Sequence, residues 1–407
     1  MSTLLGSFSS NFKTNDIMLS ILNQLSTDLK HRQKIEICGL QGSSAALFAA
    51  RLHTMQAQQQ ALCCIVPTDD LLEPLAGDIS LFTNVPVLIY PAFEIAPYTR
   101  LAPDPATTAT RLSTLYFLQE RSQPCIVLTS AEALLRRVMP KRVLSNHCEL
   151  VMTGEEADRE GLIVALTRAG YQPCELVRQP GDLAIRGGIV DLYPPASQLE
   201  TQGPLRLDFF DDTVDSIRLF DPLSQRSLEE LDEAVLLPAS DILFPNNPEG
   251  VKRWQQELPS ATSDEDRQML QQLREQIRFP GIEFFLPLIY QQPETLFDYL
   301  PAETLFLLHD PLAISRKIEL VWERIAVNYE EAAAEGLALA PKTLFLESAE
   351  LERLEQTLRI DLCLQPNPDA LQPPIIQQAG DHSLLSQEID LQRKKRGILA
   401  PLADRLL

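Results

Sequence analysis

A glycine-rich turn stands where a nucleotide-binding loop would lie. The segment GLQGSSAALFAARL begins at Gly39, directly after a short apolar run and before a stretch with helical spacing. Active loops of this kind read G-x-x-x-x-G-K-[ST], in which the lysine contacts the β- and γ-phosphates and the hydroxyl holds Mg²⁺. Aligned on G-x-x-G-S, the corresponding residues here are Gly39, Gly42, Ser43, Ser44, Ala45 and Ala46.

Two alanines take the places of the side chains that would do the chemistry. Ala45 stands at the lysine position, Ala46 at the hydroxyl position, and Ser44 where a glycine is usual. Without the lysine, phosphate affinity and transition-state charge stabilisation both fall. We therefore interpret the segment as a strand-to-helix turn, a vestigial form of a nucleotide loop.

No other catalytic or metal site is indicated. The pair Asp232-Glu233 resembles the acidic pair of a helicase, but it follows Glu229-Glu230-Leu231 and not a buried apolar strand, so we expect a solvated helix end. The seven cysteines are odd in number, no two have metal-ligand spacing, and four lie in apolar runs, so we expect reduced, buried thiols. The sequence thus predicts no catalytic residue, no metal and no cofactor.

Residues 204–221, PLRLDFFDDTVDSIRLFD, predict a β-hairpin with strands at 205–210 and 214–220. Side chains alternate between the two faces of a strand. Arg206 and Phe210 therefore share one face, and the apolar residues between them share the other. Arg186 lies in another extended run, just before Gly187-Gly188, and paired glycines in a strand indicate a bulge or a close backbone approach.

Two arginines and an aromatic residue on a solvated sheet face are typical of protein-interface hot spots. Arg186, Arg206 and Phe210 are therefore candidate partner-binding residues. Two other interpretations stay open at this point. Either arginine could be a surface charge paired with a nearby acid such as Asp208, and the Phe210 ring could fold under the turn into the core.

The elements around these residues predict an α/β protein with an insertion. Short apolar runs alternate with helical patterns up to residue 148, which favours a parallel sheet covered on both faces. Residues 149–238 hold a helix followed by three extended runs, typical of a small α+β unit with an antiparallel sheet. The α/β pattern returns at 239–338 and includes a long helix at about 312–335.

A further α/β piece is predicted at 339–407, with a strand at 343–348 and a last helix at about 385–407. The chain stops on that helical pattern without a cap, so we expect it to be part of a longer polypeptide. We therefore expect one domain formed by 1–148 and 239–338, an inserted domain at 149–238, and a partial third domain at 339–407.

The composition predicts a globular protein with protein partners. The chain has 407 residues, 45% of them hydrophobic, and a formal net charge of −21. Lys and Arg supply most nucleic-acid affinity, so a chain this acidic is expected to repel DNA. No run approaches the roughly 18 apolar residues of a membrane span, and the N-terminus lacks the pattern of a signal peptide. We expect a cytoplasmic protein with no membrane partner.

The stretch AIRGGIVDLYPPASQLETQGPLRLDFFDDTVDSIRLFDPLSQRSLEE closely resembles the N-terminal part of the bacterial transcription-repair coupling factors (Mfd). That part is similar to domains 1a, 2 and 1b of the excision-repair helicase subunit UvrB. Residues 93–118, 236–245 and 281–305 resemble the same family. The resemblance implies a degenerate, helicase-like domain 1 at 1–148 and 239–338, with domain 2 at 149–238.

The resemblance also implies the partners. Domain 2 of this family binds the damage-sensing ATPase UvrA, and the family's interface positions fall on Arg186, Arg206 and Phe210. In the resting full-length protein this face is implied to be masked by the protein's own C-terminal region. ATP, Mg²⁺, RNA polymerase and DNA are implied to be bound only by domains outside these 407 residues.

The expected function is therefore a non-catalytic recruitment module of transcription-coupled nucleotide excision repair. The alternative is a nucleotide-hydrolysing or DNA-binding helicase-like fragment. That alternative would need a lysine at position 45 and an acidic Mg²⁺ ligand, and the sequence supplies neither.

Overall fold

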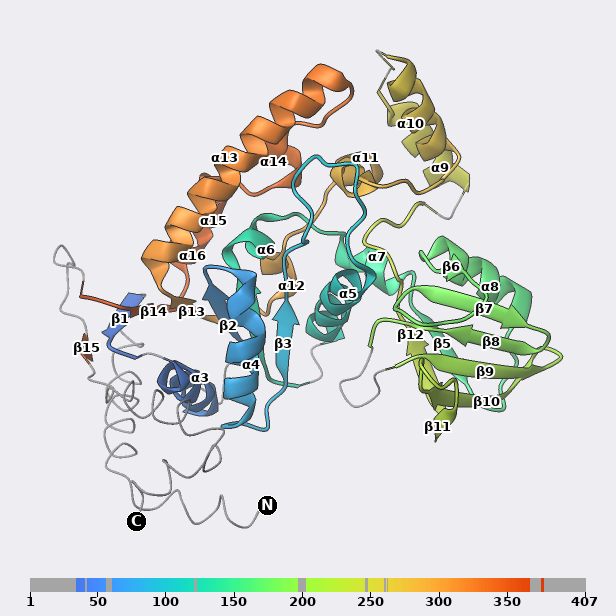
Figure 1. Cartoon of the computed structure of the whole chain (residues 1–407), viewed down its shortest axis with the longest axis horizontal. Helices are drawn as coiled ribbons and strands as arrows, with labels where there is room; N and C mark the ends of the chain where they lie inside the picture. The colour runs from blue at the N-terminus through green and yellow to red at the C-terminus, as the bar shows by residue number, and fades with distance from the viewer. Residues whose placement is uncertain are drawn as a thin grey trace, which may run out of the picture.

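The computed structural model describes residues 34–40, 42–55, 61–120, 123–196, 203–245, 248–259, 261, 263–366 and 375–376. Within these residues the chain forms a seven-stranded sheet, a six-stranded sheet and a two-stranded ladder (Figure 1). The predicted α/β class, with a parallel sheet and a separate unit built on a mostly antiparallel sheet, is confirmed.

Every pair of neighbouring strands in the seven-stranded sheet is parallel. The strands, in spatial order, are β15 (Ile375–Ile376), β1 (Lys34–Cys38), β14 (Arg359–Cys363), β13 (Leu305–His309), β2 (Ala61–Val66), β4 (Cys125–Ser130) and β3 (Val87–Tyr90). β2 and β4 are buried along their whole length, as expected of strands with helices on both faces.

Helices cover this sheet on both sides, and alternate residues of each strand face opposite layers. Cys63 of β2 belongs to one apolar cluster and its neighbour Cys64 to the other. One layer holds α3 (Ser43–Met55) and α4 (Leu72–Ser80), and α4 directly follows η2 (Asp69–Leu71). The opposite layer holds α5 (Pro105–Glu120), α6 (Ala131–Leu135), α7 (Lys141–Ser145) and α13 (Pro311–Glu335).

The inserted unit begins and ends on two adjacent strands. The chain enters through β5 (Glu149–Met152) and leaves through β12 (Glu233–Leu236), and these strands pair antiparallel. The acidic pair at 232–233 therefore lies at the start of a strand, not at the helix end we predicted. Between them lie α8 (Arg159–Arg168) and the sheet β11 (Ser227–Leu231), β10 (Thr213–Phe220), β9 (Leu205–Phe210), β8 (Ile189–Leu192), β7 (Asp182–Arg186) and β6 (Gln172–Pro173).

After the insertion the chain rejoins the first core. Ile242 and Leu243 are buried in the same apolar cluster as α5 and α13. The helices that follow are α9 (Pro248–Glu257), α10 (Asp264–Arg274), η3 (Ile282–Phe285), α11 (Leu286–Ile289) and α12 (Leu296–Tyr299). The predicted long helix at 312–335 is present as α13.

The described part of the expected third domain differs from the prediction. Strand β14 lies between β1 and β13 within the seven-stranded sheet and does not start a separate sheet. The predicted strand at 343–348 is instead α14 (Pro341–Leu344) and a single bridge at Phe345, followed by α15 (Ser348–Leu351) and α16 (Arg353–Gln356). An apolar run predicts a strand but not which sheet the strand joins. The predicted helix at 385–407 lies outside the described residues.

Cysteine burial agrees with the sequence. Cys38, Cys63, Cys64 and Cys125 are buried and none of the seven cysteines forms a disulfide. Burial raises the pKa of the Cys125 thiol to about 12, so this group stays protonated near neutral pH. No helix of the described residues is long and apolar enough to cross a membrane.

Candidate protein-binding site

The predicted hairpin is present and carries the candidate face. β9 and β10 pair antiparallel around a turn in which Asp211 has a φ of 52°. Leu205 and Leu207 are buried, whereas Arg206 is half-buried and Phe210 has 75% of its surface exposed. The Phe210 ring therefore lies in solvent on the arginine face and is not folded into the core.

A buried carboxylate joins the two candidate arginines. Asp191 of β8 lies opposite Arg206 of β9 and has no exposed surface. Arg206 donates from Nε to Asp191 Oδ1 at 2.7 Å and from Nη2 to Oδ2 at 2.9 Å. Arg186 donates from Nη2 to the same Oδ2. One carboxylate thus faces two guanidinium groups, and the cluster keeps one uncompensated positive charge.

The two arginines are not equally available. The Arg206 side chain is only 17% exposed, and its guanidinium carbon lies 5.0 Å from the ring centroid of Phe220. Its hydrogen bonds to Asp191 raise the already high pKa of Arg206. The Arg186 side chain is 46% exposed, so this guanidinium offers more of its surface to a partner.

The paired glycines bring two strands close together. Gly187 has a φ of 60°, and a Cβ added at Gly188 would lie 2.6 Å from the carbonyl oxygen of Phe209. The Phe209 amide donates to the Gly188 carbonyl at 2.8 Å. The predicted close backbone approach is confirmed, and it fixes the end of β7, where Arg186 lies.

The acid suggested by the sequence as an arginine partner was the wrong one. Asp208 lies opposite Ser216 and accepts a hydrogen bond from Arg218 at 2.6 Å. Asp191 is the actual partner of Arg186 and Arg206, and our sequence analysis missed it. The signal was present, because Asp191 is a lone charge in the apolar run IVDLY, five residues after Arg186 and one extended run before Arg206.

The glycine-rich turn lies between β1 and α3, as predicted. Gly39 and Gly42 have φ values of 95° and 54°, and the Ala45 amide donates to the Gly42 carbonyl at 3.0 Å. The Ser43 hydroxyl donates to Asp78 Oδ2 of α4 at 2.7 Å.

The side chains of Ala45 and Ala46 point into the core. Ala45 is 2% exposed and Ala46 is fully buried, and both belong to the apolar cluster between α3 and the sheet. Ser44 follows Ser43 in the first turn of α3 and is half-buried. The turn therefore connects a strand to a helix, and the side chains of Ala45 and Ala46 contribute to packing.

Comparison with known proteins identifies the inserted unit. Residues 150–242 match the family model described as the UvrB interaction domain. This range contains the three candidate residues and Asp191. The chain is also 31% identical over 405 residues to the transcription-repair-coupling factor of Myxococcus xanthus, covering 94% of this chain.

The chain is related to the transcription-repair-coupling factors. It is 33% identical to the factor of Escherichia coli K12 over 269 residues and 30% identical to that of Haemophilus influenzae over 311 residues. These matches cover 65% and 75% of this chain. The family recognised from residues 186–228 is thus confirmed. The chain spans 33%, 26% and 23% of the lengths of the Myxococcus, Haemophilus and Escherichia relatives.

Proposed function

We propose that residues 149–238 bind UvrA and that the chain is a non-catalytic recruitment module of transcription-coupled nucleotide excision repair. The observation that carries this proposal is that the family match and the candidate binding face lie in the same unit. The segment that matches the UvrB interaction domain also presents Phe210, 75% exposed, on the same sheet face as Arg186 and Arg206. The relatives' name, transcription-repair-coupling factor, supports the pathway.

The chemistry of the face fits an acidic or carbonyl-rich partner surface. Phe210 supplies an apolar anchor that loses its water on binding, and Arg186 offers a half-exposed guanidinium to carboxylates or carbonyls. Arg206 acts mainly by holding Asp191, so that the cluster keeps its shape and its positive charge.

We propose further that this part of the protein hydrolyses no nucleotide. The turn at Gly39–Ala46 is interpreted as a degenerate phosphate loop, because buried alanines stand at its lysine and hydroxyl positions. The module itself would then use no cofactor, while ATP and Mg²⁺ are used by other domains of the full-length family proteins.

The rest of the proposal concerns the longer protein. The C-terminal region of the full-length chain would mask the Phe210 face at rest, and RNA polymerase and DNA would be bound by domains outside the 407 residues. The protein would act in the cytoplasm without a membrane partner. The isolated chain would therefore bind UvrA without further activation.

The test is a titration of purified UvrA with the chain by isothermal calorimetry. We expect Phe210→Ala to weaken binding by about 2 kcal/mol or more, roughly thirtyfold in Kd, because a buried aromatic anchor is lost. Arg186→Ala is expected to weaken binding through loss of a charge-assisted contact. Leu223→Ala is the matched control, since Leu223 is 93% exposed in the loop between β10 and β11.

Unchanged UvrA binding by the triple variant Arg186→Ala, Arg206→Ala and Phe210→Ala would contradict the proposed interface. An ATP-turnover assay on the same preparation tests the alternative, a nucleotide-hydrolysing fragment. Turnover that disappears on Ser43→Ala or Ser44→Ala would favour that alternative.

A further inference from the structure

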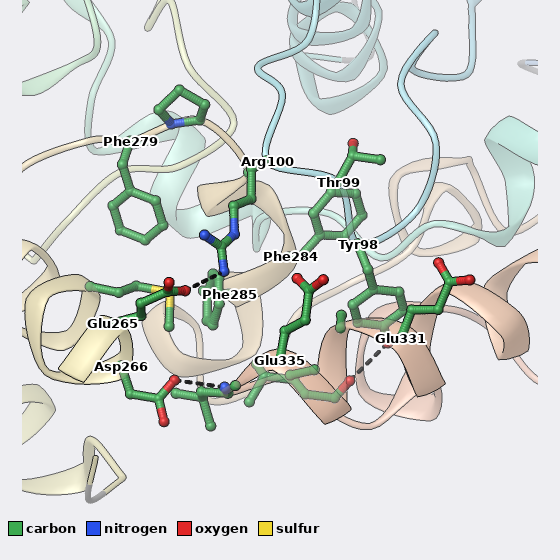
Figure 2. Close-up of a pocket in the computed structure, with 18 of the residues that line it drawn as sticks. Tyr98, Thr99, Arg100, Glu265, Asp266, Phe279, Phe284, Phe285, Glu331 and Glu335 are labelled. Atoms are coloured by element: carbon green, nitrogen blue, oxygen red, sulfur yellow. Dashed lines mark hydrogen bonds and ion pairs between the residues drawn. The ribbon is translucent and has the colours of Figure 1, made fainter. Parts of the chain in front are cut away.

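A second surface feature lies outside the inserted unit. A groove of about 700 Å³ is bounded by the loop at 97–100, by α10, by η3 and by the C-terminal end of α13 with residues 336–339 (Figure 2). This volume is in the range of sites that hold a small ligand or a few side chains of a peptide. None of its lining residues lies within 149–238.

Aromatic side chains form the floor of the groove. Tyr98 stacks on Phe284 with ring centroids 5.5 Å apart, and Phe279 meets Phe285 edge-on at 5.9 Å. Met269 of α10 also lines this part of the groove. The floor is therefore suited to an apolar side chain.

Carboxylates border the groove. Glu331 and Glu335 lie one turn apart on α13, both are exposed, and neither forms an ion pair with a described residue. Glu265 and Asp266 lie across the groove on α10 (Figure 2). Arg100 is the one cationic residue among the lining residues that the structure describes, so the lining carries an excess of negative charge.

Arg100 shows that the groove accommodates a guanidinium group. Its side chain extends over the groove, and Nη2 lies 2.9 Å from Glu265 Oε2 (Figure 2). The hydrogen bond from this guanidinium to Glu265 and the charges of Glu265 and Glu335 raise the pKa of Arg100. A guanidinium is thus stabilised beside the aromatic floor, while the exposed Glu331 carboxylate forms no ion pair with a described residue.

The walls of the groove are tightly built. A Cβ at Gly281 would lie 2.6 Å from the Thr99 carbonyl oxygen, and one at Gly336 would lie 2.7 Å from Asp266 Oδ1. The Tyr98 hydroxyl donates to the Leu339 carbonyl at 2.8 Å. These contacts hold the groove open in a defined shape, which lowers the cost of ordering on binding.

We propose that this groove binds a peptide segment of a partner protein that carries an arginine or lysine next to an apolar side chain. The cation would contact Glu331 and Glu335, and the apolar side chain would pack on Phe279 and Phe285. Charge favours this occupant over a nucleic acid, because phosphates would be repelled by the carboxylates of the rim.

The experiment is fluorescence anisotropy of the 407-residue chain with three labelled peptides. The probes are repeats of Arg-Leu-Ala, of Glu-Leu-Ala and of Arg-Ser-Ala. We expect saturable binding of the Arg-Leu-Ala peptide, about tenfold weaker binding of the Arg-Ser-Ala peptide, and none of the acidic peptide. Binding should weaken as salt is raised, because the glutamates are exposed.

Variants assign the binding to the groove. The double change Glu331→Gln and Glu335→Gln is expected to weaken Arg-Leu-Ala binding about tenfold, and Ala332→Arg, which fills the groove and adds a positive charge, is expected to abolish it. The matched control is Glu323→Gln with Glu330→Gln, two exposed acids of the same helix outside the groove.

Several results would overturn the proposal. They are wild-type affinity in both groove variants, equal binding of the acidic and basic peptides, or no saturable binding below about 1 mM. Competition of a single-stranded DNA oligonucleotide for the same site would indicate a nucleic-acid groove instead. UvrA binding provides an independent readout, and the groove variants should leave it unchanged.

Discussion

Asp191 and Phe210 lie on the same sheet face but in opposite environments. The carboxylate is fully buried between two guanidinium groups, whereas the ring is mostly in water. Burying a carboxylate costs several kcal/mol unless it is paired and hydrogen-bonded. Because Arg206 supplies two hydrogen bonds and Arg186 a third, the pairing offsets that cost and fixes where the guanidinium groups lie.

Replacing Asp191 by Asn should therefore destabilise the inserted unit by about 3 kcal/mol, because two cations lose their shared carboxylate. Asp208→Asn is the comparison, since its pair with Arg218 is partly exposed and its loss should cost about 1 kcal/mol or less. Urea unfolding followed by circular dichroism measures both. Equal losses in the two variants would show that Asp191 does not hold the cluster together.

Glu283 predicts a pH dependence of stability. Burial raises its pKa from 4.5 to about 7, and its Oε2 accepts no hydrogen bond from the described residues. Between about pH 4.5 and pH 7 the folded protein keeps a proton that the unfolded chain has released, so this group makes the unfolding free energy fall as pH rises. Glu283→Gln should remove that decline. The check is to measure the unfolding free energies of the wild type and the variant at several pH values. A difference between them that stays constant with pH would contradict the prediction.

At the level of elements, sequence patterns predict the secondary structure of each segment better than its position in the fold. Apolar runs separated by helical spacing are enough to predict the parallel sheet. Alternation in RLDFF puts Phe210 on the arginine face, but only the structure shows that the ring is exposed there. The expected boundary at residue 339 places RIDLC in another domain, because this sequence does not indicate its neighbours, whereas in the structure β14 pairs with β1 and β13. The groove was missed for a related reason, since its lining residues come from segments distant in sequence.

The β7–β8 turn offers a test at this scale. Gly188→Ala should destabilise the protein by about 2 kcal/mol, because the new Cβ would press on the backbone of Phe209 and separate β8 from β9. Gly77→Ala is the control with the opposite sign. Gly77 lies in α4 with nothing within 4 Å of an added Cβ, so alanine should stabilise by roughly 0.5–1 kcal/mol. Thermal unfolding distinguishes the two, and a harmless Gly188→Ala would refute the close contact.

On the scale of the whole molecule, the inserted unit has its own core. The cluster that contains Leu166, Val190 and Leu207 draws only on residues between 151 and 239. Arg278 of the first domain anchors the unit from outside, because its Nη2 donates to the Arg168 carbonyl at the end of α8 at 2.6 Å. This contact joins the unit to the first domain and lies outside the unit's own core.

Residues 149–238 expressed alone should therefore unfold in a single cooperative transition. A version ending at residue 232 should not, because it lacks β12 and leaves β5 without its partner. Near-ultraviolet circular dichroism against temperature measures both. A broad, non-cooperative unfolding transition for 149–238 would mean that its core depends on the parallel-sheet domain.

The pairing of β5 with β12 has one further implication, for genetics. The two points where the chain crosses into and out of this unit are neighbours in space, so a short linker from residue 148 to residue 237 could excise it as a cassette. An organism with this deletion would keep the functions of the parallel-sheet scaffold and lose those of the inserted unit, whereas a destabilising point variant affects both.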